Sequence, residues 1–154
     1  MGIKGLLAAA AAVIGLSGVV CTGKASAQAY PPGTFSVDGI PVVCGPVWFV
    51  VTPQVPDVGM ADGQGRIFLN PMFLAGLPTP LKLYWVAHEC GHYFVGANEV
   101  AADCWAMKVG KAQGWFPPQA FQAMMQMFQN NPGDMAHPSG PQRVANMMAC
   151  YSAN

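Results

Sequence analysis

The sequence predicts an α+β domain in which a small antiparallel β-sheet comes first and about four helices follow. Three observations indicate this class. Runs rich in β-branched and aromatic residues are confined to the part of the chain before residue 70. Helix start and stop signals divide the chain after that point. No internal repeat or low-complexity tract interrupts residues 28–154, a length that suits one domain with a modest core.

The first 27 residues have the pattern of a signal peptide. Lys4 supplies a short positive region, and residues 6–20 form an apolar run rich in small residues. Residues 25–27 read Ala-Ser-Ala, which is a cleavage signal. We therefore expect residues 1–27 to be a signal peptide and residues 28–154 to be the folded domain. Lipid attachment at Cys21 is a weaker alternative.

The charge balance of the expected domain argues against several classes of partner. Residues 28–154 hold five basic and seven acidic side chains, a formal charge of −2. The absence of a basic stripe speaks against nucleic acid and against acidic membrane surfaces. No further stretch of the sequence has the length and hydrophobicity of a membrane span, so we expect no stable membrane insertion after signal cleavage. A periplasmic or secreted protein is the expectation.

Two short runs predict the sheet. Residues 47–52 (Val-Trp-Phe-Val-Val-Thr) read as a buried strand and residues 66–69 (Arg-Ile-Phe-Leu) as a second one. Asp62-Gly63 is a turn signal between them. We expect the region 47–69 to form a small antiparallel sheet or hairpin, and residues 30–46 to be irregular because Pro and Gly interrupt them.

Cap residues mark the helices. Thr79-Pro80 fits an N-cap followed by proline at the first helical position, and Gly96 fits the end of that helix. Asn98 can cap the next helix. Together the signals predict four helices, at about residues 80–96, 98–114, 117–129 and 139–151.

The first helix contains the motif His88-Glu89-Cys90-Gly91-His92. Residues four apart share a helix face, so His88 and His92 can direct ring nitrogens at one ion. Glu89 lies about 100° round the helix, where its carboxylate can reach a water molecule on the metal without ligating the metal. The motif predicts one zinc ion and Glu89 as the general base of a hydrolytic reaction.

A third ligand is required, and Glu99, Asp103 and His137 are the candidates. Glu99 and Asp103 lie four apart on one face of the second helix, and the small residues 101–102 between them permit a close approach to the first helix. Glu99 is also placed to interact only with the helix dipole. For Asp103 we expect an outer role, in which it accepts the remaining ring N–H of a ligating histidine.

Two further segments resemble a known family. Residues 99–106 (Glu-Val-Ala-Ala-Asp-Cys-Trp-Ala) are similar to the E-x-x-A-D-x-x-A segment of the CAAX-prenyl-protease-like, or HtpX-like, zinc metallopeptidases of the gluzincin type. Residues 137–144 (His-Pro-Ser-Gly-Pro-Gln-Arg-Val) resemble the H-P-x-x-x-x-R-[IV] segment of the same family. The resemblance covers roughly residues 80–147 in three blocks.

The resemblance implies a zincin-like fold with the metal site between the first two helices. It implies His88, His92 and Glu99 as ligands and Asp103 as a supporting residue. It further implies that His137 and Arg143 line the catalytic cleft, where they stabilise an oxyanion or orient Asp103.

The sequence departs from the family in two respects. Only six residues separate His92 from Glu99, which forces a tight turn through residues 96–98 and leaves open whether Glu99 or Asp103 meets the metal. The membrane helices of the family are also missing. The chain thus resembles a minimal, exported version of the catalytic core.

Four cysteines remain after residue 27, and an even number in an exported chain predicts two disulfides. We expect Cys90 to pair with Cys104, which would brace the two ligand-bearing helices, and Cys44 to pair with Cys150. The tight turn between the helices favours this connectivity, although the side chain of Cys90 can also point away from the second helix.

The leading hypothesis is a zinc-dependent metallopeptidase that acts on a peptide or protein substrate. Residues 66–69 precede the metal helix and are a candidate edge strand for pairing with an extended substrate, or else a plain structural strand. The alternative hypothesis is a non-catalytic binding or structural protein, stabilised by zinc, in which His137 fills the fourth coordination position.

Overall fold

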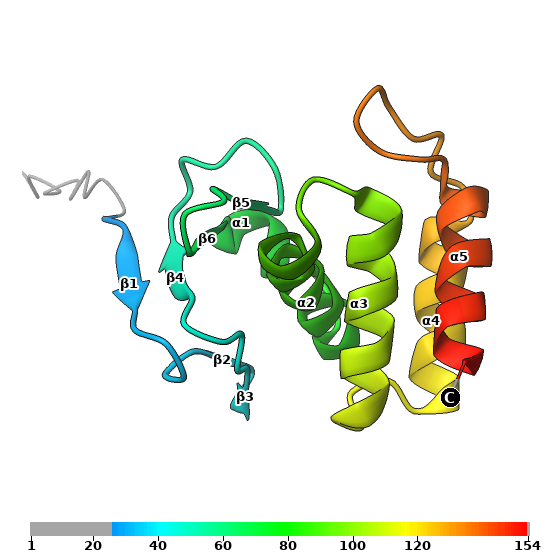
Figure 1. Cartoon of the computed structure of the whole chain (residues 1–154), viewed down its shortest axis with the longest axis horizontal. Helices are drawn as coiled ribbons and strands as arrows, with labels where there is room; N and C mark the ends of the chain where they lie inside the picture. Colours follow the sequence, from blue (N-terminus) through cyan, green and yellow to red (C-terminus); the bar gives the residue numbers. More distant parts are fainter. Residues whose placement is uncertain (1–25, 154) are drawn as a thin grey trace, which may run out of the picture.

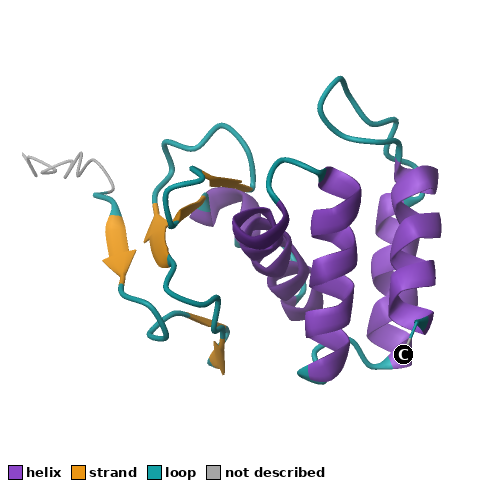
Figure 2. Cartoon of the chain, in the orientation of Figure 1, coloured by secondary structure: helices purple, strands orange, loops and turns teal. Residues whose placement is uncertain are grey.

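The computed structural model describes residues 26–153, so the expected signal peptide lies outside the described residues except for its last two positions. The described chain is α+β, as the sequence predicts, with strands in the first half and helices in the second. Figure 2 shows the strands gathered on one side of the molecule and the helices on the other.

A four-stranded sheet forms the first layer, with the strand order β1-β4-β6-β5. β1 pairs antiparallel with β4, β4 pairs parallel with β6, and β6 pairs antiparallel with β5. A separate pair, β2 and β3, lies in the segment expected to be irregular. The strands span Gln28–Tyr30 (β1), Ser36–Val37 (β2), Ile40–Pro41 (β3), Trp48–Val51 (β4), Gly59–Ala61 (β5) and Arg66–Leu69 (β6).

The expectation of a purely antiparallel sheet over residues 47–69 is wrong, because β4 and β6 are parallel neighbours. The chain leaves β4, crosses over, and returns as β5 at the outer edge of the sheet. It then turns at Asp62, whose carboxylate accepts hydrogen bonds from the backbone N–H groups of Gln64 and Arg66. That turn inserts β6 between β4 and β5. The predicted turn signal therefore joins β5 to β6 and not β4 to β6.

The four predicted helices are confirmed within one or two residues at every end. They are α2 (Thr79–Val95), α3 (Glu99–Ala112), α4 (Pro118–Phe128) and α5 (Gly140–Ser152), and a short helix α1 (Pro71–Leu74) precedes them. α2 ends at Gly96, which has φ of 69°, a conformation that glycine adopts without strain. The side chain of Asn98 accepts from the backbone N–H of Ala101 and so caps α3.

α2 lies at the centre of the molecule. Figure 1 shows the sheet, α2, α3 and then α4 with α5 in succession across the view. Helix α2 is accordingly buried on most of its surface from Leu81 to Gly91, as expected for a helix with packing partners on several sides. One core runs through these layers and includes Phe49 and Leu69 of the sheet, Leu83 of α2, and Met107 of α3.

α2 and α3 approach each other closely where Gly91 meets Ala102. A Cβ atom added at Gly91 would lie 3.0 Å from both the Cα and the carbonyl oxygen of Ala102. The small residues predicted to permit this approach are thus in contact with a glycine of the metal-binding motif. This contact fixes the distance between the helix that carries His88 and the helix that carries Glu99.

Two disulfides are present, as predicted, but their connectivity differs from the expectation. Cys44 pairs with Cys90, and Cys104 pairs with Cys150, with Cα–Cα distances of 5.8 and 5.2 Å. Cys90 follows His88 by two residues, which is about 200° round the helix, so its side chain leaves the opposite face of α2. It therefore meets the segment before β4 and not α3.

The disulfides have a consequence for the compartment. Structural disulfides form in oxidising environments, so the pair indicates an extracellular or periplasmic environment. Among residues 26–153, no helix combines the length and the hydrophobicity that crossing a membrane requires.

Candidate metal centre and cleft

His88 and His92 present their Nε2 atoms to the same point. The two Nε2 atoms are 3.1 Å apart, and each ring has an oxygen beside its other nitrogen. Nδ1 of His92 lies 2.8 Å from the carbonyl oxygen of Gly96, to which it donates. Nδ1 of His88 lies 2.9 Å from a carboxylate oxygen of Asp103, although this contact is not aligned as a hydrogen bond. The hydrogen bond at His92 and the nearby carboxylate at His88 both favour the tautomer with the proton on Nδ1, in which Nε2 carries a lone pair.

Glu99 completes a group that can hold a metal ion. Its Oε2 lies 3.1 Å from Nε2 of His88, and its Oε1 lies 3.4 Å from Nε2 of His92. Ligand atoms around a tetrahedral zinc ion, with bonds of about 2.0–2.2 Å, are roughly 3.3 Å apart. Oε2 of Glu99 is buried and accepts no hydrogen bond within the described residues, so it is free to ligate an ion. The donor set and its spacing therefore fit a bound metal ion.

Asp103 lies behind His88, on the side away from the converging Nε2 atoms. Its carboxylate accepts from the hydroxyl of Tyr84 and from two nitrogens of Arg143, with Nη2 at 2.6 Å from Oδ1 and Nε at 2.9 Å from Oδ2. Nη2 of Arg143 also donates to the hydroxyl oxygen of Tyr84. Asp103 therefore lies between His88 and Arg143, next to the ring nitrogen of His88 and bound by the guanidinium of Arg143.

The buried charged groups of this network shift one another's pKa values. Although burial by itself raises the pKa of Asp103, the contacts with His88 and Arg143 outweigh it and lower that pKa to about 2. Burial lowers the pKa of His88, but its contacts with Asp103 and Glu99 outweigh burial and raise that pKa to about 9. The surroundings of His88 therefore attract positive charge, which a bound cation satisfies as well as a proton.

Glu89 points into the same cleft and has no partner. The residue is only 6% exposed, and no hydrogen bond or ion pair reaches its carboxylate within the described part of the chain. Burial, together with the nearby carboxylates Glu99 and Asp57, raises its pKa, against the lowering effect of the two motif histidines. A carboxylate with a raised pKa and no fixed partner is suited to accept and release a proton.

β5 passes directly over Glu89. A Cβ atom added at Gly59 would lie 2.7 Å from Cγ of Glu89 and 3.2 Å from its Cδ. Only glycine therefore lets the strand and this carboxylate pack at the observed distance.

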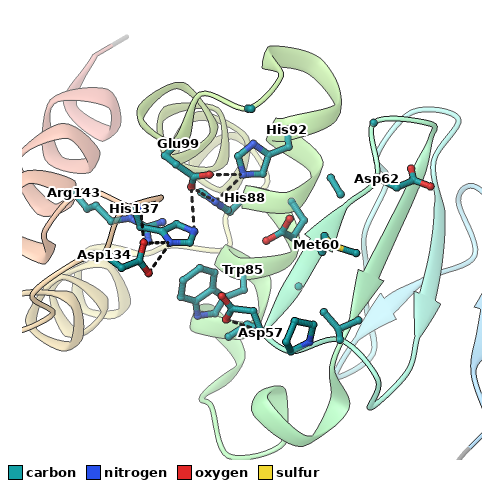
Figure 3. A pocket seen from close by; sticks show the side chains of 18 of the residues that line it. Asp57, Met60, Asp62, Trp85, His88, His92, Glu99, Asp134, His137 and Arg143 are labelled. Carbon is teal, nitrogen blue, oxygen red and sulfur yellow. Dashed lines mark hydrogen bonds and ion pairs between the residues drawn. The ribbon is translucent and has the colours of Figure 1, made fainter.

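His137 reaches the site from the loop before α5. Its Nε2 lies 3.8 Å from Oε2 of Glu99, and its Nδ1 lies 3.0 Å from a carboxylate oxygen of Asp134. Figure 3 shows His92 and His137 next to the carboxylate of Glu99 on different sides, with Asp134 beside His137. His137 is not part of the three-residue ligand group, but its free ring nitrogen faces that group.

These residues line one cleft with a cavity volume of about 820 Å³. One wall is the segment from Val55 to Gly63, which includes β5, and the other walls are α2, the start of α3 and the loop before α5. Figure 3 shows β5 on one side of the site and His137 on the other. The three ligand candidates, Glu89 and His137 all face this space.

β5 leaves one edge of its backbone free. The N–H of Asn70 donates to the carbonyl of Val58, which fixes Val58 as a residue bonded to β6. Because bonded residues alternate in an antiparallel pair, the backbone groups of Gly59 and Ala61 point away from β6. The hypothesis that residues 66–69 form the edge strand is wrong, since β4 and β5 occupy both sides of β6. The free edge next to the site belongs to β5.

Sequence reasoning missed four contributors. Tyr84 was detectable, because it precedes His88 by four residues and so shares its helix face. Asp134 was detectable from its position three residues before His137. Gly59 and Asp57 had no local signal, because β5 has little β-branched or aromatic character.

Comparison with protein-family models, with curated proteins and with solved structures gives no match for this chain. The resemblance to zinc metallopeptidases therefore remains one of sequence segments.

Proposed function

We propose that the protein is a zinc-dependent metallopeptidase of zincin-like fold, exported to the periplasm or secreted. One observation carries the proposal. His88 and His92, each with an oxygen atom beside its Nδ1, have their Nε2 atoms 3.1 Å apart, and Glu99 completes the group. Next to them the buried carboxylate of Glu89 has no partner in the described chain. At that distance the two lone pairs repel one another unless a cation, either a proton on one Nε2 or a metal ion, lies between them.

His88, His92 and Glu99 are the residues that would hold the zinc ion. Zinc, when bound, supplies a Lewis acid that polarises a carbonyl group and makes water acidic near neutral pH. Ring nitrogens and a carboxylate are zinc ligands, and three protein ligands leave a position open for catalysis.

The protein's own groups perform the remaining work. Glu89 accepts a proton from the attacking water, as its raised pKa and lack of a partner favour. His137, held through Nδ1 by Asp134, directs Nε2 into the cleft, where it can donate to the oxygen of the substrate carbonyl. Arg143 acts through Asp103 as a positioning residue, because its guanidinium is bound to that carboxylate and is only 3% exposed.

A peptide is the substrate that the cleft suits. The free backbone groups of Gly59 and Ala61 can pair with an extended peptide, as sheet edges do in β-strand addition. Such a peptide would cross directly over Glu89, because Gly59 lies against that side chain. The scissile bond and the general base would then be neighbours.

The test compares Glu89→Gln with Glu99→Ala and with the unmodified protein, expressed with its signal segment and purified from the oxidising compartment. Each protein is analysed for bound metal and for cleavage of a mixed peptide library. We expect Glu89→Gln to keep the metal and lose hydrolysis, and Glu99→Ala to lose both. Hydrolysis by Glu89→Gln at the unmodified rate would refute the proposal.

A second candidate function is a zinc-stabilised binding or structural protein without turnover. The observation that favours it is the distance of 3.8 Å from Nε2 of His137 to Glu99, which is short enough for a small rotation to bring His137 to the same ion. In that case His137→Ala would lower metal affinity and thermal stability together. For the peptidase, the same variant keeps its metal and loses turnover.

A further inference from the structure

The charge of the cleft is strongly one-sided. Among the Lys and Arg side chains of residues 26–153, Arg143 alone lines it, and that guanidinium is buried on Asp103. The histidines of the lining, His88, His92 and His137, belong to the site described above. The lining carboxylates are Asp57, Asp62, Glu89, Glu99 and Asp134. A cleft with this lining favours cationic groups and disfavours acidic ones.

Four of these carboxylates either belong to the proposed catalytic site or are bound by other groups of the protein. Glu99 belongs to the ligand group, and Glu89 is the unpartnered buried carboxylate aimed into the cleft. Asp134 holds His137, and Asp62 is bound by Arg66 at 2.6 Å and by two backbone N–H groups. Asp57 remains.

Asp57 is exposed in the cleft and carries no cationic partner. Its Oδ1 accepts only from the neighbouring backbone N–H of Val58, and no ion pair reaches either oxygen within residues 26–153. It lies two residues before the start of β5, so an extended chain paired with β5 would have side chains near Asp57. The carboxylate is thus available to a group on the substrate.

The surroundings of Asp57 suit the stem of a long cationic side chain. Val55, Pro56 and the indole of Trp85 line the same cleft. In the view of Figure 3, Asp57 and Trp85 occupy one end of the pocket and His92 the other. Lysine and arginine bury their aliphatic stems on apolar surface, and their charged ends interact with aromatic rings and carboxylates.

We propose that this cleft selects peptides with a lysine or arginine side chain close to the reacting bond, and that Asp57 receives this side chain. The inference rests on the proposed function, because it names the substrate class of the same site. In this proposal, Asp57 at one end of β5 determines which peptides bind, whereas the motif residues His88 to His92, with Glu89 as the base, carry out the reaction.

Binding and cleavage are measured separately, so that the two proposals can fail separately. Zinc-loaded Glu89→Gln protein is titrated with a fluorescent peptide that contains one central arginine and with a matched peptide that contains glutamine there. We expect the arginine peptide to bind about fivefold more tightly at low salt, and the difference to shrink as ionic strength rises. The unmodified protein is then tested for the ratio of kcat/KM on the same pair.

Three variants complete the test. Asp57→Asn should reduce the preference to a ratio of about one, and Asp57→Lys should reverse it in favour of a glutamate peptide. Asp38→Asn is the matched control, because it makes the same charge change on a carboxylate that binds Lys82 outside the cleft. It should keep the full preference.

Equal binding of both peptides, or a preference that survives Asp57→Asn, overturns the inference even if peptides are cleaved. Selective binding that depends on Asp57, without cleavage by the unmodified protein, supports the inference and refutes the peptidase function.

Discussion

Replacing Gly91 by alanine tests whether the spacing of α2 and α3 sets the metal site. The new Cβ would lie 3.0 Å from the Cα and the carbonyl oxygen of Ala102 and 3.2 Å from its Cβ. Because two of these neighbours are backbone atoms, α3 itself must move by several tenths of an ångström. Glu99 begins that helix, three residues earlier, so it would move away from His88 and His92.

The magnitude follows from two opposed effects. Alanine is favoured over glycine in a helix by about 1 kcal/mol, and overpacking a close contact costs about 1–3 kcal/mol. The free energy of unfolding should therefore fall by at most about 2 kcal/mol. When α3 moves to relieve this strain, Glu99 leaves its position beside the two histidines. Binding of zinc would then have to restore the strained spacing at a cost of about 1–3 kcal/mol, which lowers zinc affinity about 5- to 150-fold.

The assay is zinc competition against a chelator of known affinity, with thermal unfolding followed by circular dichroism. Gly76→Ala is the matched control, because a Cβ atom there meets nothing within 4 Å. Adding Ala102→Gly to Gly91→Ala should not restore affinity, since the backbone contacts of Ala102 remain. Zinc affinity of Gly91→Ala within twofold of the unmodified protein would refute the argument.

Three further predictions concern the same centre. Gly59→Ala should displace Glu89 and lower peptide hydrolysis about 100-fold while metal content, measured by elemental analysis, stays constant; unchanged turnover contradicts the contact. The pKa of Asp103 falls on folding from 3.8 to about 2, so its contribution of about 2 kcal/mol is complete above pH 4 and is lost as pH falls towards 2. Acid titration of unfolding should show this loss, and it should be absent in Asp103→Asn. The double variant Cys104→Ala/Cys150→Ala should lose about 4 kcal/mol in denaturant unfolding, as expected for cysteines 46 residues apart; a loss below 1 kcal/mol contradicts it.

The helices were predictable because their signals are local. Thr79-Pro80 and Asn98 mark starts, and Gly96 marks an end, and none of these depends on distant parts of the chain. The motif residues His88 and His92 were predictable for the same reason, since a spacing of four fixes a common helix face.

The sheet was less predictable because strand order depends on long-range pairing. Residues 48–51 and 66–69 carry strong β character, but nothing local distinguishes a hairpin from parallel neighbours with a third strand outside them. Residues 59–61 lack such character, and they form a strand because β6 offers an edge. The edge strand of the cleft was therefore assigned to the wrong segment.

The predicted disulfide connectivity is wrong, and the rotation of about 100° per residue along a helix explains why. Cys90 is two residues from each motif histidine, which places it about 160° round the helix from both. A helix that turns both histidines towards α3 therefore turns Cys90 away from α3. Gly91 occupies the position that meets α3. The tight turn does bring the two helices together, but the residue at their contact is Gly91 and not Cys90.

The residues that can hold the metal ion are close together in the sequence, whereas the residues that support them are far away in the sequence. All three ligand candidates lie within twelve residues, joined by a turn in which the carbonyl of Gly96 holds His92 and the side chain of Asn98 starts the helix of Glu99. The groups that support them come from α5, forty or more residues away, through Arg143 on Asp103 and Cys150 on Cys104. A helical hairpin alone therefore contains every ligand but lacks the charge that balances Asp103. Because Arg143 supplies two of the hydrogen bonds that Asp103 accepts, docking of α5 supports the position of Asp103 beside His88.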